Sequence, residues 1–172
     1  MKLGRYLEGQ FYCYLMHLNY GTGTDENRKT IWEFGKNHRM IGLDLSDVNQ
    51  DWNTKTQKQK EEFHREAPNW FDHFEKFCNS MTKNDSVIIV AGHNLFLGLG
   101  RITTKDYQYN PRLKNERKFF DHTRKVEWEI ALDYDNRVKL GKPLKGFNRT
   151  LLRITPNHKY WKILENLNIT IS

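Results

Sequence analysis

One short motif in the sequence has almost the spacing of a nucleotide-binding site. The segment at residues 23–30 reads GTDENRKT, follows an expected strand, precedes an expected helix and resembles a phosphate-binding P-loop. A P-loop has a second glycine where this chain has Arg28, because backbone N–H groups must approach the phosphates closely. The side chain of Arg28 would block that approach, so the spacing does not predict nucleotide binding.

The acidic residues and the histidines also lack a catalytic or metal-binding pattern. Asp44, Asp47 and Asp51 are spaced superficially like calcium ligands, but the glycine and the terminal glutamate of a calcium loop are absent. The seven histidines show no metal-ligand spacing, and Glu127 and Glu129 have no nuclease lysine motif beside them. We therefore expect no catalytic residue, no bound metal ion and no cofactor.

Aromatic and basic side chains are the chemical groups that stand out. The chain has five Trp, eight Tyr and ten Phe, and its 28 Lys and Arg exceed its 21 Asp and Glu, which gives a formal charge of +7. Aromatic faces stack on bases and cations contact phosphates, so this combination favours a nucleic-acid partner. Trp70, Trp128 and Trp161 fall in regular patterns and should be core residues, whereas Trp32 and Trp52 are pocket candidates.

Length and composition indicate a single folded domain spanning residues 1–172. Hydrophobic residues make up 37% and charged residues 28%, which argues against disorder. The sequence has neither a membrane-spanning apolar run nor a signal peptide, so we expect a cytoplasmic protein without membrane contact. Cys13 and Cys78 are too few for a disulfide framework and should be buried thiols.

These side chains must be positioned by strands and helices that the sequence pattern predicts. Six apolar segments rich in aromatic or β-branched residues are typical of strands: residues 11–17, 40–45, 86–91, 95–102, 125–134 and 151–155. The third and fourth should form a hairpin, because they are separated by Gly92, His93 and Asn94. Gly98 and Gly100 indicate strong bending in the fourth segment, so we expect an α+β fold with a curved barrel.

Helices are expected between the strands, at residues 28–36, 55–80 and 157–167. Pro68 should end or kink the second helix, after which Trp70, Phe74, Phe77 and Met81 recur at helical spacing on a core-facing stripe. The third helix has Thr155 as its expected cap and Pro156 in its first turn, with Trp161 and Leu164 pointing inward. The predicted order is therefore a mixed series of strands and helices.

A series of short motifs between about residues 11 and 134 occurs in a familiar order. The motifs are IWEF at 31–34, MIGLDLSD at 40–47, Phe74 to Phe77, NDSVIIVAG at 84–92, LGLGRI at 97–102, Tyr107 and HTRKVEW at 122–128. This order resembles the EVE-like domain of the PUA superfamily, which is related to YTH domains. Such domains occur at the N-terminus of McrB-type proteins of modification-dependent restriction systems, so the chain could be part of a longer protein.

The resemblance implies a PUA-like curved β-barrel with surrounding helices and a pocket that receives a flipped nucleotide. Related EVE and YTH domains read modified cytosine or N6-methyladenine in this way. Extruding a base costs a few kcal/mol of stacking, which aromatic walls and hydrogen bonds to the base edge must offset. We therefore expect a non-catalytic reader of modified DNA, with GTP hydrolysis in a separate motor domain and DNA cleavage in a partner nuclease subunit.

The resemblance also assigns the binding residues. Trp32 matches the tryptophan after the first strand and is the expected main pocket wall. The other expected base-pocket residues are Asn19, Tyr20, Asp44, Leu45, Trp52, His93 and Asn94. The expected phosphate contacts lie in or beside loops: Lys36, His38, Arg39, Arg112, Lys114, Arg117, Lys118 and Arg124.

Three alternatives remain at the level of sequence. An RNA-binding PUA-like domain would use the same barrel and basic surface and would exploit 2′-hydroxyls or single-stranded loops. A small hydrolase on the same fold would lose its activity with a single acidic or lysine substitution. A protein-interaction module would use its charge only for solubility and would bind DNA weakly and without regard to modification.

Overall fold

The computed structural model describes residues 2–18, 24–43, 50–111, 120–145 and 150–169. Its strands are β1 (Cys13–Leu18), β2 (Met40–Leu43), β3 (Ser86–Ala91), β4 (Leu95–Ile102), β5 (Gln108–Tyr109), β6 (His122–Ala131), β7 (Val138–Lys139) and β8 (Leu151–Ile154). Its α-helices are α1 (Gly4–Leu7), α2 (Asp25–His38), α3 (Gln57–Glu66), α4 (Pro68–Glu75) and α6 (Lys159–Glu165). Two short 3-10 helices, η1 (Trp52–Thr54) and η3 (Tyr134–Asn136), and one π-helix, η2 (Lys76–Ser80), complete the helical segments described. None of these helices is long and apolar enough to cross a membrane.

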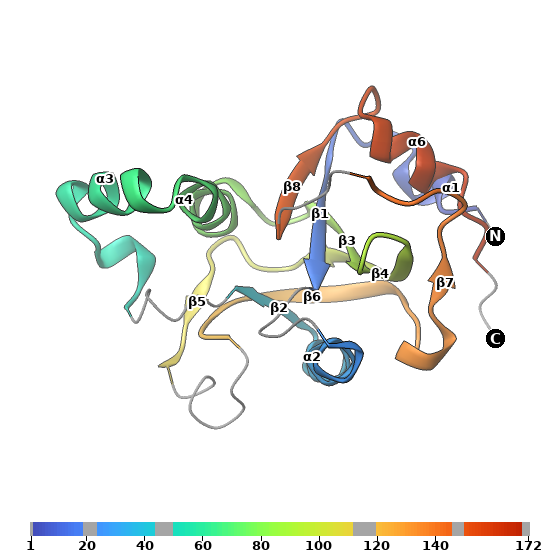
Figure 1. Cartoon of the computed structure of the whole chain (residues 1–172), viewed down its shortest axis with the longest axis horizontal. Helices are drawn as coiled ribbons and strands as arrows, with labels where there is room; N and C mark the ends of the chain where they lie inside the picture. The colour runs from blue at the N-terminus through green and yellow to red at the C-terminus, as the bar shows by residue number, and fades with distance from the viewer. Residues whose placement is uncertain (1, 19–23, 44–49, 112–119, 146–149, 170–172) are drawn as a thin grey trace.

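The strands form one sheet that curls into a half-barrel (Figure 1). Six strands lie in the order β2-β6-β4-β3-β1-β8, while β5 pairs with β6 and β7 pairs with β4. β1 and β3 are parallel, whereas the β3–β4 and β4–β6 pairs are antiparallel. The register shifts between Ile89 and Val90 and between Leu99 and Gly100, and such bulges bend a strand. The α+β class and the curvature expected from the sequence are therefore confirmed.

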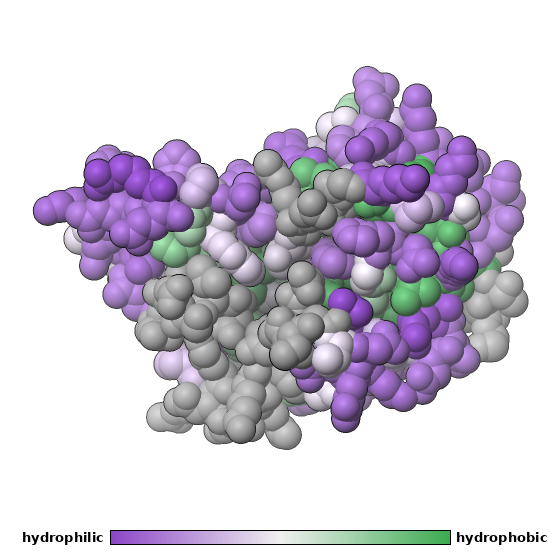
Figure 2. Space-filling view, viewed as in Figure 1, coloured by the Kyte–Doolittle hydropathy of each residue, from purple (hydrophilic) through white to green (hydrophobic). Residues whose placement is uncertain are grey.

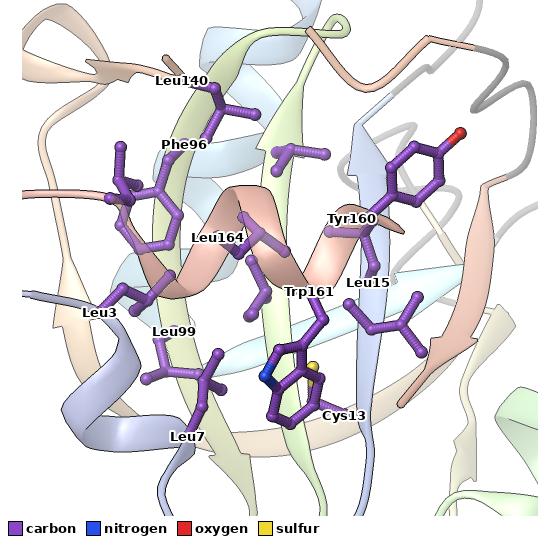
Figure 3. Close-up of a cluster of buried hydrophobic side chains, with 14 of the residues drawn as sticks. Leu3, Leu7, Cys13, Leu15, Phe96, Leu99, Leu140, Tyr160, Trp161 and Leu164 are labelled. Carbon is purple, nitrogen blue, oxygen red and sulfur yellow. The ribbon is translucent and has the colours of Figure 1, made fainter. Parts of the chain in front are cut away.

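Helices cover both faces of the sheet, because successive residues of its central strands point to opposite faces and are apolar on both. On β1, Cys13 and Leu15 join a core cluster with side chains of α1 and α6 (Figure 3). Tyr14 and Met16 alternate with them and join a second cluster that includes side chains of α2 and α4. The sheet therefore separates α6 on one side from α2 on the other (Figure 1).

Local capping signals explain where the helices before β3 begin. Thr24 caps α2, since its side chain accepts a hydrogen bond from the backbone N–H of Asn27 at 3.2 Å. Thr56 and Gln59 form a capping box at the start of α3. Pro68 begins α4, because its fixed φ suits a first helical turn but does not allow α3 to continue. The expected break of the 55–80 segment at Pro68 is confirmed.

Helix α6 begins later than the sequence predicts. Its cap is His158, whose Nδ1 accepts a hydrogen bond from the backbone N–H of Tyr160 at 3.2 Å. The predicted cap at Thr155 is wrong, because the Thr155 carbonyl instead accepts the His158 N–H in a turn before the helix. Trp161 and Leu164 are buried against the sheet side, as predicted.

Candidate nucleic-acid interface

A small apolar cavity lies between α2 and the sheet, close to the ends of β1 and β2. Trp32 of α2 and Trp128 of β6 form part of its lining, together with Leu18, Gly42 and Phe120. The cavity volume is about 30 Å³, which is room for roughly one water molecule. The cavity therefore brings the predicted main wall, Trp32, together with a second indole.

The two indoles meet edge to face, with ring centroids 5.1 Å apart and planes at 68°. Trp32 is only 2% exposed, and its Nε1 donates a hydrogen bond to the Leu132 carbonyl at 2.8 Å. A buried indole whose donor is satisfied has little freedom to reorient. Trp32 is thus a fixed wall and also a core residue.

Two glycines of β4 provide the space that the indoles occupy. A Cβ atom added at Gly98 would lie 2.6 Å from Cη2 of Trp32 and 2.7 Å from the Ile130 carbonyl oxygen. A Cβ added at Gly100 would lie 2.7 Å from Cε3 of Trp128. All three separations are shorter than van der Waals contact, so the indole pair depends on glycine at both positions.

Trp128 differs from Trp32 in how it is held. Its side chain is only partly buried, but its Nε1 is buried and has no hydrogen-bond partner among the described residues. A buried donor without an acceptor is unfavourable by about 1–3 kcal/mol, so an acceptor placed there by a ligand would be stabilised. The sequence predicts Trp128 as a core residue and misses this position on the cavity. The Gly98-x-Gly100 spacing on the neighbouring strand is the signal that points to it.

Trp52, the other predicted pocket tryptophan, is a core residue instead. It is 0% exposed and stacks on Phe74 with ring centroids 5.0 Å apart. Its Nε1 donates a hydrogen bond to Oε1 of Glu75 at 2.7 Å. The prediction for Trp52 is wrong, because the aromatic stripe of α3 and α4 encloses it.

The remaining predicted base-pocket residues divide into two groups. His93 and Asn94 lie in the β3–β4 turn, where the His93 ring stacks on His17 at 5.6 Å, and neither belongs to the described lining of the cavity. The other four lie outside the described residues: Asn19, Tyr20, Asp44 and Leu45. Along the chain these four directly follow Leu18 and Leu43, the last described residues of β1 and β2.

Arg124, a predicted phosphate contact, is used inside the fold. It is 1% exposed, and its guanidinium donates to the carbonyls of Phe77 at 2.6 Å, Cys78 at 3.1 Å and Lys105 at 3.0 Å. These acceptors are the chain's own backbone, so the side chain ties η2 and the segment after β4 to β6. The prediction that Arg124 lies beside a loop and binds phosphate is therefore wrong.

The other predicted phosphate contacts are only partly available. Lys36 forms ion pairs with Glu33 and Asp133, each at 2.7 Å, which neutralise its charge. Nδ1 of His38 donates to a backbone carbonyl of α2, while Arg39 is exposed and forms no ion pair with a described residue. The remaining four lie outside the described residues: Arg112, Lys114, Arg117 and Lys118.

A polar pocket of about 320 Å³ lies beside Asp51, Cys78, Lys105 and Tyr107. The Tyr107 hydroxyl donates to Asp51, and burial followed by this bond raises the pKa of Tyr107 above its usual range. Burial raises the pKa of the Cys78 thiol and raises that of Cys13 to about 12, and both cysteines are free and buried as predicted. Protonated thiols and phenols are poor nucleophiles and bases, so these groups are not activated for hydrolysis.

The described fold and cavity define an α+β domain on a curled half-barrel, with an indole pair between α2 and the sheet. A family model described as a domain of unknown function, DUF8426, matches residues 17–153, and the chain belongs to this family. The matched region contains α2, the indole pair and both glycines, while α1 and α6 lie outside it. Comparison with curated proteins and with solved structures gives no match.

Proposed function

We propose that this domain binds nucleic acid and reads a base at the cavity between Trp32 and Trp128. The observation that carries the proposal is the pair of indoles between α2 and the sheet, one of which has a buried N–H without an acceptor among the described residues. Stacking of one base on an aromatic side chain contributes about 1–3 kcal/mol. The net charge of +7 favours an anionic partner.

The size of the cavity determines how a base could enter. Its volume of about 30 Å³ is far below the roughly 300–1,000 Å³ of typical ligand pockets, so one wall must move. Trp32 is held by its bond to the Leu132 carbonyl, whereas Trp128 is partly exposed and its indole N–H makes no such bond within the described chain. Trp128 is therefore the wall that swings outward and then donates to the base.

The finer part of the proposal is the identity of the base. The resemblance to EVE-like domains favours a flipped, modified base in DNA, either methylated cytosine or N6-methyladenine. The domain then acts as the targeting module of a McrBC-type restriction system and has no catalytic role of its own. A methyl group in an apolar pocket adds only about 1–3 kcal/mol of discrimination, so we expect a preference rather than absolute selectivity.

Binding to short duplexes that differ at one base tests this proposal. The duplexes carry cytosine, 5-methylcytosine, 5-hydroxymethylcytosine or N6-methyladenine, and binding is measured at about 0.15 M salt, where weak long-range attraction is screened. We expect one modified duplex to bind about 10-fold tighter than the unmodified one. Equal binding to all duplexes, or none, contradicts base reading in DNA, and tighter binding to single-stranded RNA of the same sequence assigns the domain to RNA.

The variant Trp128→Phe tests whether the preference for the modified duplex arises at the cavity. Phenylalanine retains an aromatic wall but removes the indole N–H, so the preference for the modified duplex should fall to about 2-fold or less. Trp52→Phe is the matched control, because Trp52 is a buried tryptophan whose N–H bonds to Glu75 away from the cavity. A preference that survives in Trp128→Phe and disappears in Trp52→Phe contradicts the assignment of the cavity.

A further inference from the structure

A second surface lies on the side of the sheet opposite α2. It is a groove of about 730 Å³ between α6 and the segment that begins at β7. Its polar lining consists of long cationic and short amide side chains: Lys139, Lys142, Lys159, Lys162, Asn166 and Asn168. The described lining contains no carboxylate, and hydrophilic side chains gather over α6 in Figure 2. We call this surface the lysine groove.

The lysines of the groove are exposed and have no acidic partner within the described chain. No ion pair with a described residue is formed by Lys139, Lys142 or Lys162. Lys159 donates to the Lys145 carbonyl at 3.2 Å, which leaves its positive charge in place. Four like charges around one groove repel one another, and a bound anion would relieve that repulsion.

We propose that the lysine groove binds the phosphate backbone of the nucleic acid, an inference that rests on the proposed function. The described lining has no aromatic side chain on which a base could stack, and lysine ammonium groups act as point charges for phosphate. The volume of the groove exceeds that of one phosphate group, and its lysines come from two separate segments. A polymer with phosphates at regular intervals satisfies several of these cations together.

The groove and the cavity then contribute different parts of the binding free energy. Phosphate contacts are the same for every base, so the lysine groove raises affinity for modified and unmodified duplexes alike. The indole pair contacts one base and therefore determines the ratio of the affinities for the modified and the unmodified duplex. Groove contacts also release counterions, so they determine how steeply binding weakens with salt.

The double variant Lys142→Ala/Lys162→Ala tests the groove. Binding of modified and unmodified duplexes is measured between about 0.05 and 0.3 M salt, beside the charge-matched control Lys58→Ala/Lys83→Ala. Lys58 and Lys83 are exposed and lie outside the groove. We expect the groove variant to weaken binding of both duplexes roughly 10- to 30-fold at 0.15 M salt and to reduce the salt slope by about 1–2, with the preference unchanged.

The outcomes separate the two proposals. If the groove variant and the control weaken binding equally, the groove makes no specific contribution and this inference is overturned. If binding falls but no duplex is ever preferred, the groove is supported and base reading fails. If the variant instead loses binding to phosphatidylserine vesicles while duplex affinity is unchanged, the groove serves a lipid surface and the inference is also overturned.

Discussion

The cations beside α2 and the cations of the lysine groove differ in what neutralises them. Lys36 is held by Glu33 and Asp133, and Arg137 by Asp25 at 3.0 Å. The groove lysines have no such carboxylates among the described residues. Both regions contain several lysine and arginine side chains, but Lys36 and Arg137 are neutralised by their carboxylates, whereas the groove lysines keep their charge for a partner. The net charge of a chain therefore says little about where an anion binds until the internal pairs are known.

Arg124 is the extreme case of an internally bonded cation, and Arg124→Leu should have the largest effect on stability. The substitution leaves two buried carbonyls and one partly buried carbonyl without their donor, so we expect the free energy of unfolding to fall by about 3–5 kcal/mol. Urea unfolding followed by tryptophan fluorescence measures this loss. Lys142→Ala in the groove should change stability by less than about 0.5 kcal/mol. An Arg124→Leu protein of normal stability but weaker DNA binding would restore Arg124 as a phosphate contact.

His17 of β1 is buried, and its burial disfavours a positive charge on the ring. The free energy of unfolding should therefore depend on pH. Burial, then the positive charges of His93 and Arg28, lower the pKa of His17 to about 4, against about 6.5 in the unfolded chain. As the pH falls below 6.5, His17 becomes protonated in the unfolded state but stays neutral in the folded state. The part of the free energy of unfolding that depends on neutral His17 is therefore present above pH 6.5 and is lost towards pH 4. Between pH 7 and 4.5 the loss should be about 2–3 kcal/mol.

His17→Gln isolates this contribution, because glutamine does not titrate. Urea unfolding at several pH values gives the free energy of unfolding of the wild type and of the variant as a function of pH. The contributions of the other titrating groups cancel in the difference between the two curves. The variant should lose about 2–3 kcal/mol less than the wild type over the same pH range. Parallel stability curves would mean that His17 is protonated equally in the folded and unfolded states.

Gly98→Ala changes the packing of the indole pair beneath α2 without changing any charge. The added Cβ meets Trp32 and the Ile130 carbonyl at less than 3 Å, so we expect a destabilisation of about 1–3 kcal/mol and a displaced indole pair. Gly141→Ala is the matched control, since a Cβ there has no neighbour within 4 Å. Thermal unfolding and the near-UV circular dichroism of the tryptophans report both effects. Equal stability of the two variants would contradict the close approach at Gly98.

Local sequence pattern predicts the central strands well and the peripheral elements poorly. Residues 86–91 and 95–102 coincide with β3 and β4, because they are apolar, β-branched and bounded by turn residues. The two-residue strands β5 and β7 and the four-residue α1 are too short to show a period. Their position depends on pairing and packing with distant segments, which no local window contains.

The binding residues were harder to predict, because burial depends on tertiary contacts. Arg124 and Trp128 are even-numbered positions of β6, as is the buried Val126, so strand alternation already indicates that they face inward. Trp52 lies in an irregular segment, and its burial arises from side chains of α3 and α4. The lysine groove joins Lys142 to α6, and only the packing of α6 on the sheet brings these segments together.

Exchanging single lysines gives the smallest expected change in stability and the most direct test of the contrast between the two regions. Lys36→Met removes two ion pairs that are partly open to solvent, so stability should fall by about 0.2–1 kcal/mol while DNA affinity is unchanged. Lys142→Met removes an unpaired charge, so stability should stay the same while affinity falls about 5-fold at 0.15 M salt. Urea unfolding and a duplex titration on both proteins measure the two quantities. The reverse result, in which Lys36→Met weakens DNA binding and Lys142→Met does not, would mean that the ion pairs of α2 open for phosphate and that the groove charge serves only solubility.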